Sequence, residues 1–108
     1  MTAKTWTKLL AVDQCGPGQG RFVAVGPHEL AVFHLSEPDR FVVCRNSCPH
    51  AGANISAGSV AGAIVTCPWH HWMFDLDTGR CTEISSVTVR KYECRVEDGD
   101  LYALLGEM

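Results

Sequence analysis

Two short stretches, Cys48-Pro49-His50 and Cys67-Pro68-Trp69-His70, decide how this chain folds and what it can do. Each stretch offers one thiol and one imidazole, and sixteen residues separate His50 from Cys67. Thiolate is a soft, negatively charged ligand, whereas imidazole is a neutral ligand that is softer than carboxylate. Two such loops facing each other predict a site for either a single metal ion or a two-iron cluster.

The spacing favours the two-iron cluster over a structural zinc ion. Zinc sites with two Cys and two His usually place Cys near Cys and His near His. Here each loop pairs a Cys with a His, which suits a binuclear cluster in which one iron takes both sulfurs and the other both imidazoles. Glycines at 52, 58 and 62 would let the backbone approach such a cluster closely. A non-redox zinc-binding interaction module remains the alternative from another class.

The length, charge and cysteine content of the chain limit the functions that it can have. The 108 residues fit one domain, and the net charge of −3 argues against nonspecific binding to nucleic acid or anionic lipid. Nothing approaches the roughly 20 apolar residues that span a bilayer. No export signal precedes the six cysteines, so metal or redox chemistry is favoured over disulfides. We therefore expect a cytoplasmic protein with no membrane or nucleic-acid partner.

Short apolar runs separated by turn residues predict an all-β fold. We expect strands over residues 6–12, 22–25, 30–35, 41–44, 63–66, 87–96 and 101–105. The last two should form a hairpin around Asp98-Gly99, with a bulge near Arg90-Lys91. The stretch from Arg45 to Leu76 is otherwise irregular, and long irregular segments usually carry function.

The ligand pattern resembles that of the Rieske family, which has C-x-H, then roughly fifteen to twenty residues, then C-x-x-H. The resemblance covers nearly the whole chain and implies an antiparallel β-sandwich with an inserted two-loop cluster-binding subdomain, at about residues 45–76 of a single domain 1–108. It also implies one 2Fe-2S cluster per chain. Cys48 and Cys67 would bind the inner iron, and His50 and His70 the outer, solvent-facing iron.

The same resemblance predicts a low reduction potential. In the family, a disulfide between the loops and hydroxyls that bond the cluster sulfur tune the potential. The disulfide positions correspond here to Ala53 and Trp69, and the hydroxyl positions to Trp72 and Phe74, none of which can serve. Fewer donors leave the added electron less stabilised, so we expect about −150 mV rather than +300 mV.

His71 departs from the family pattern, which usually has Gly after the second His. His71 could be a surface spacer, could compete with His70 as ligand, or could add a protonatable group beside the outer iron; the C-x-x-H spacing favours His70.

The remaining notable residues have structural interpretations. We expect Cys15, Cys44, Cys81 and Cys94 to be structural; an exposed, oxidisable thiol is the alternative for Cys15, which lies in a glycine-rich loop. The aromatic residues expected in the core are Trp6, Phe22, Phe33, Phe41 and Tyr92. Trp69 and Trp72 should either pack under the cluster or form an apolar docking rim, and the acidic side chains of Glu83, Glu93, Glu97 and Asp98 should face solvent.

Resemblance implies a monomeric, non-catalytic electron carrier of an oxidoreductase system. It would pass single electrons from a flavin reductase to a terminal oxygenase in a ring-hydroxylating dioxygenase. The alternative is the small subunit of an assimilatory NAD(P)H nitrite reductase, which would bind a large subunit stably rather than transiently. Many such subunits lack the four ligands that this chain has.

Overall fold

The computed structural model describes residues 4–36, 38–47, 54–68, 71–84 and 86–106. Within these residues, ten strands form three antiparallel sheets, and two single-turn 3₁₀ helices, η1 (Val12–Gln14) and η2 (Ile55–Ala57), connect them. In spatial order, the first sheet contains β1 (Lys4–Ala11), β10 (Asp100–Gly106) and β9 (Cys94–Glu97). The second contains β2 (Gly20–Val25), β3 (His28–Leu35), β4 (Arg40–Arg45) and β8 (Lys91–Tyr92). The third contains β5 (Ser59–Ala61), β6 (Ile64–Thr66) and β7 (Met73–Asp75).

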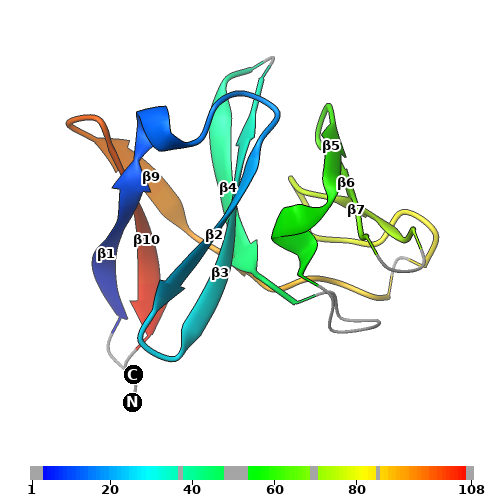
Figure 1. Cartoon of the computed structure of the whole chain (residues 1–108). Helices are drawn as coiled ribbons and strands as arrows, with labels where there is room; N and C mark the ends of the chain where they lie inside the picture. Colours follow the sequence, from blue (N-terminus) through cyan, green and yellow to red (C-terminus); the bar gives the residue numbers. More distant parts are fainter. Residues whose placement is uncertain (1–3, 37, 48–53, 69–70, 85, 107–108) are drawn as a thin grey trace.

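The second sheet is the middle layer of the molecule, between the first and the third (Figure 1). Strand β3 shows why. Leu30 and Val32 pack into a core shared with the first sheet, whereas Ala31 and Phe33 pack into a core shared with the third. A strand buried on both faces needs apolar residues at consecutive positions, which explains the unbroken apolar run from Leu30 to Phe33 in β3. The expected all-β sandwich is confirmed.

The prediction of one strand over residues 87–96 is wrong. Tyr92 in β8 pairs with Val43 of the second sheet, whereas Cys94 in β9 pairs with Ala103 of the first. The chain crosses between the two sheets at Glu93, whose carbonyl accepts a hydrogen bond of 2.9 Å from the Leu104 N–H. The slip in apolar alternation that predicted a bulge near Arg90-Lys91 precedes this crossing: Val89 packs in the core shared with the third sheet, and Tyr92 packs against the core shared with the first. The described irregularity in pairing lies elsewhere, between Lys8 and Leu10.

The hairpin around Asp98-Gly99 is confirmed. Glu97 pairs with Asp100, so the turn has two residues, and both lie in the left-handed region, with φ of 52° at Asp98 and 81° at Gly99. Positive φ at both central residues is the geometry of a type I′ turn, for which Asp-Gly is a preferred sequence.

Two further expectations need correction. Only β6 of the third sheet was predicted, because strands of three residues such as β5 and β7 are too short to show a period of two. Phe22 was expected in the core but is 53% exposed, since it lies on the edge strand β2 with its side chain in the opposite phase to Val23 and Val25. Phe33 is fully buried, as expected.

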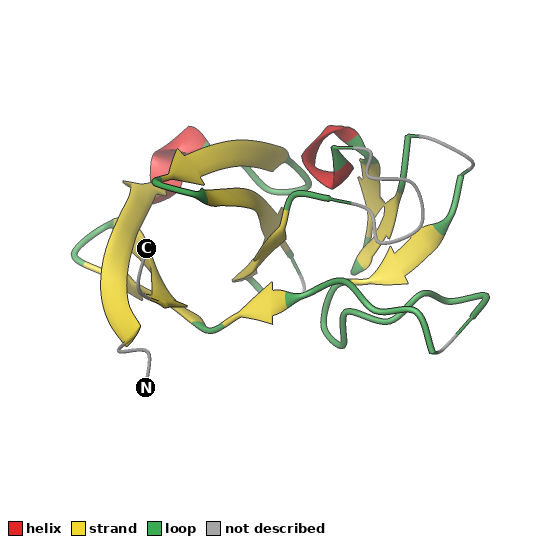
Figure 2. Ribbon diagram, turned by 90° about the horizontal axis from the view of Figure 1, so that it is seen from below, coloured by secondary structure: helices red, strands yellow, loops and turns green. Residues whose placement is uncertain are grey.

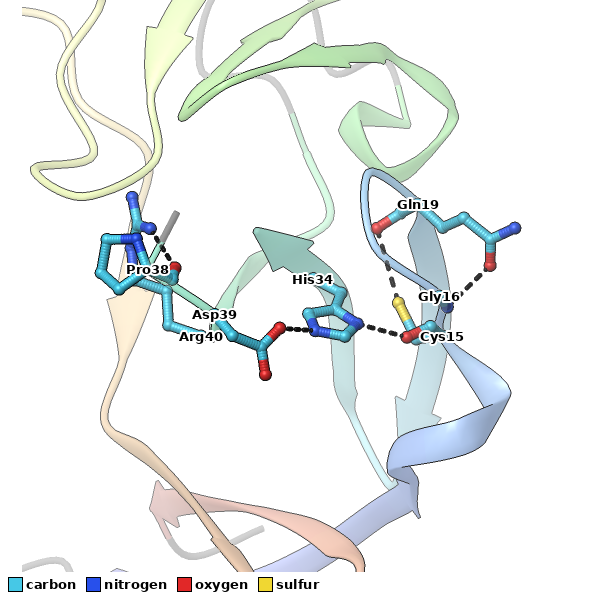
Figure 3. A network of polar contacts seen from close by, with 7 residues as sticks. All are labelled: Cys15, Gly16, Gln19, His34, Pro38, Asp39 and Arg40. Atoms are coloured by element: carbon cyan, nitrogen blue, oxygen red, sulfur yellow. Dashed lines mark hydrogen bonds and ion pairs between the residues drawn. The ribbon is translucent and has the colours of Figure 1, made fainter. Parts of the chain in front are cut away.

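A polar network fastens the loops at one end of the second sheet (Figure 3). His34 Nδ1 donates to the Cys15 carbonyl at 2.7 Å, and its Nε2 contacts the carboxylate of Asp39. Beside it, Arg40 donates twice to Asp77, at 2.9 and 2.7 Å, and this bonding holds the pKa of the Asp77 carboxyl below its usual value. Arg40 thereby links β4 to the turn that follows β7.

No helix among the described residues is long and apolar enough to cross a membrane.

Candidate metal centre

Both loops that carry Cys and His residues reach the third sheet at the same end. The first loop (residues 46–58) enters β5 at Ser59, and the second loop (residues 67–72) joins β6 to β7. Ser59 pairs with Thr66, and Thr66 pairs with Met73, so the end of the first loop and both ends of the second lie side by side. Figure 2 shows η2, which belongs to the first loop, beside the strands of this sheet. The described bases of the two loops are thus neighbours.

Gly58 permits the closest contact between the loop arms. A Cβ at this position would lie 2.3 Å from the Thr66 carbonyl oxygen and 3.0 Å from the Val65 side chain. Real Cβ atoms do not approach backbone oxygens so closely, so only glycine lets the first loop run this close to the strand that leads into Cys67.

The second loop is closed at its base by the main chain. The Cys67 N–H donates to the Trp72 carbonyl at 2.7 Å. Cys67 itself is fully buried and belongs to the same core as Ile55, Val65 and Phe74. A thiol in this position meets the need of a soft metal ligand for a site shielded from water.

The first loop is held at its base by Asn46, a residue that sequence reasoning missed. Its Oδ1 accepts from the Ser56 N–H at 2.9 Å, its Nδ2 lies 3.5 Å from Asn54 Oδ1, and its own N–H donates to the Glu29 carbonyl at 2.9 Å. Asn46 is 4% exposed and is the single buried polar residue among those described. The side-chain amide of Asn46 therefore joins the two arms of the loop, and its backbone N–H joins them to β3.

Of the four predicted ligands, the structure describes Cys67 alone. Cys48, His50 and His70 lie outside the described residues, as do Ala53 and Trp69. Accordingly, no group of three or more His, Cys, Asp or Glu side chains within the described part of the chain is placed to hold a metal ion.

At three other cysteines, burial disfavours the thiolate, which is the form that binds metal. Burial raises the pKa of the Cys44 thiol to about 12 and also raises the pKa values of Cys15 and Cys94. The structural interpretation of Cys15 is confirmed and its exposed alternative is wrong: the side chain is fully buried, and its thiol lies 3.4 Å from the Gln19 carbonyl. Its glycine-rich loop folds over the second sheet instead of leaving the thiol in solvent.

Trp72, the last residue of the second loop, and Phe74 of β7 both contact the core. Phe74 is fully buried, and Trp72 packs partly buried against the same cluster, which favours packing toward the core over a docking rim. His71 is exposed and has a φ of 58°, a left-handed conformation that favours glycine. This conformation accounts for the glycine that the family pattern usually carries here.

Comparison with known families matches residues 5–93 to the Rieske [2Fe-2S] domain. The chain belongs to this family. It is 31% identical to the ferredoxin CarAc of Metapseudomonas resinovorans over 99 residues, which covers 90% of this chain and 91% of that protein. Its cofactor is accordingly a Rieske 2Fe-2S cluster.

Solved Rieske structures confirm the fold. The ferredoxin in a complex of reduced oxygenase and oxidised ferredoxin of carbazole 1,9a-dioxygenase superposes with a TM-score of 0.81 at 31% identity, covering 92% of both chains. A putative NADH-dependent nitrite reductase small subunit from Mycobacterium tuberculosis superposes with a TM-score of 0.85 at 28% identity, covering 97% of this chain and 98% of that one.

The described residues fit a Rieske cluster. The adjoining loop bases, the buried Cys67 thiol and the close approach at Gly58 provide a shielded sulfur donor where two loops meet. A bound Rieske cluster accepts and releases one electron, at a higher potential than an all-cysteine cluster.

Replacing Asn46 with Ala should loosen the first loop. The change leaves the Ser56 N–H without its acceptor, so we expect the free energy of unfolding to fall by about 1–3 kcal/mol and bound iron to be lost faster to a chelator. Chemical denaturation and timed iron release measure both effects. Asn54→Ala is the control, because it removes only the 3.5 Å contact and should change stability by less than about 0.5 kcal/mol. Equal effects of the two changes would contradict this role for Asn46.

Replacing His71 with Gly should leave the visible cluster spectrum unchanged, because the spacing assigns the ligand role to His70. Relief of the left-handed strain and the greater freedom of unfolded glycine oppose each other, so stability should change by less than about 1 kcal/mol. Absorption spectroscopy and thermal unfolding measure both quantities. Loss of the spectrum would identify His71 as the ligand.

Proposed function

We propose that Cys48 and Cys67 bind the inner iron of the cluster and that His50 and His70 bind the outer iron. The proposal is supported by the order and spacing of these residues in a chain of this family and by the adjacent loop bases. The chain would then act as one domain, with residues 45–76 as its cluster-binding subdomain. The two imidazoles would face solvent, where an electron can pass to another protein.

We further propose that the protein is a ferredoxin that carries single electrons from a flavin reductase to a terminal oxygenase, in the cytoplasm. The observation that carries this proposal is the similarity to CarAc, which is a ferredoxin of similar length. The similarity extends over about nine-tenths of each chain. Among the described cysteines, Cys15, Cys44, Cys81 and Cys94 form no disulfide, which accords with a reducing compartment.

Two exposed apolar side chains near the second loop support transient docking of a redox protein. Met73 directly follows the loop and is 40% exposed, and Ile84 is 42% exposed. The two lie on adjacent segments, because the Thr82 N–H donates to the Met73 carbonyl at 2.9 Å. Exposed apolar side chains next to a redox centre are typical of surfaces that bind other proteins.

The small subunit of a nitrite reductase is the second candidate function. It is favoured by the TM-score of 0.85 with the mycobacterial protein over nearly the whole of both chains. The presence of all four predicted ligands supports the ferredoxin instead, since many such subunits lack them.

The purified protein should be red-brown, contain two irons per chain, bleach with dithionite and have a midpoint potential of about −150 mV. The low potential follows because Trp72 and Phe74 offer no hydroxyl to the cluster. Metal analysis and a redox titration test this expectation. His50→Cys should shift or abolish the spectrum, since a thiolate replaces an imidazole. A strongly positive midpoint would refute the tuning argument, and a colourless, folded protein with equimolar zinc would refute the redox function.

The stability of binding to partner proteins distinguishes a ferredoxin from a nitrite reductase small subunit. The tagged protein, purified from native extract at moderate salt, should yield little stably bound protein, whereas chemical cross-linking before lysis should recover a flavin reductase and an oxygenase. Mass spectrometry of both samples identifies what is bound. A nitrite reductase large subunit that co-purifies in stoichiometric amounts without cross-linking would overturn the ferredoxin proposal.

A further inference from the structure

Two arginines lie directly opposite each other at the junction between the second sheet and the first loop. Cys44 pairs with Lys91, and the next residues along, Arg45 and Arg90, are joined by a 2.8 Å hydrogen bond from the Arg45 N–H to the Arg90 carbonyl. Side chains at directly opposed positions begin about 5 Å apart, and like charges there destabilise a sheet. An anion bound between the two guanidinium groups would relieve this repulsion.

No described carboxylate forms an ion pair with either arginine. The ion pairs among the described residues involve instead the basic side chains of Lys8, His34, Arg40 and Arg95. Both arginines are exposed. The guanidinium of Arg90 lies 5.3 Å from the centroid of the Tyr92 ring, which limits its motion.

These side chains border a pocket of about 230 Å³. Its lining consists of Pro27, His28, Glu29, Arg45, Arg90 and Tyr92. Glu29 contributes one negative charge and the arginines two positive charges, so the pocket carries a positive excess in a chain whose net charge is −3. His28 contacts the carbonyl of Gly106 at 3.3 Å through Nε2, and its ring meets Tyr92 edge-on at 6.3 Å, so the wall opposite Arg90 is also fixed.

We propose that Arg45 and Arg90 form a binding site for a carboxylate side chain of the redox partner. The planar guanidinium group matches the two oxygens of a carboxylate, and two such groups line this one pocket. Arg45 immediately precedes Asn46, at the base of the first loop, so a partner that occupies this pocket is held next to the cluster-binding loops. This inference rests on the proposed electron-carrier function and assigns the partner an acidic group at that contact.

Binding to an anionic polymer tests the site without requiring the partner. The cluster-loaded protein is passed over immobilised poly-L-glutamate and, separately, poly-L-lysine at low ionic strength, with binding followed by surface plasmon resonance. A chain of net charge −3 is repelled overall by polyglutamate, so saturable binding to it reports a local positive site. We expect such binding, weakened by added salt.

Variants locate the binding. Arg45→Gln and Arg90→Gln should each weaken polyglutamate binding by about tenfold, the loss expected for a charge-assisted hydrogen bond. Glu29→Gln should strengthen it, because the change removes the negative charge in the pocket. Arg80→Gln is the matched control, since Arg80 is exposed but does not line the pocket, and it should have no effect.

The outcomes are distinct. No binding to polyglutamate, an equal loss in Arg80→Gln, or weaker binding in Glu29→Gln would overturn the site. Tighter binding of inorganic phosphate than of polyglutamate, measured by competition, would make a free anion the ligand and overturn the assignment to a partner. Iron content and the visible spectrum are recorded for every sample, so failure of the cluster itself is detected separately from failure of this site.

Discussion

The register of the small third sheet is the constraint on which the rest of the structure depends. Thr66 pairs with Ser59 on one side and with Met73 on the other, so the arms of two loops leave the sheet at one end. Residues far apart in sequence are thereby brought together without any contact between the loop tips being required. A shift by one residue would turn Cys67 away from the core in which it is buried.

The middle sheet provides the rigid base for this arrangement. Its central strand β3 is apolar on both faces, so one core joins it to the outer sheet and another joins it to the loop-bearing sheet. Asn46 and the Arg40–Asp77 pair then tie the loop-bearing part to that base through polar contacts. Such rigidity favours electron transfer, because a site whose structure changes little with its charge has a low reorganisation energy.

Much of this could be predicted from the sequence, for definite physical reasons. Ligands in the order Cys-His then Cys-His are typical of Rieske domains, and Asp98-Gly99 suits a type I′ turn, so the family and the terminal hairpin could both be predicted. The crossing at Glu93 could not, because both segments beside it alternate normally and only their partners differ. Phe22 was misplaced because hydropathy does not show which face of an edge strand is covered. Asn46, Arg45 and Arg90 carry no local signal, since their roles depend on cross-strand neighbours.

The central claim is that two adjoining loops supply nitrogen to one iron and sulfur to the other. Electron–nuclear double resonance on the dithionite-reduced protein, with and without ¹⁵N-labelled histidine, tests it most directly. The account predicts two distinct, strongly coupled histidine nitrogens, one of which disappears in His50→Cys and the other in His70→Cys, while His71→Gly retains both. A spectrum without histidine nitrogen couplings, or with couplings that depend on His71, would contradict it.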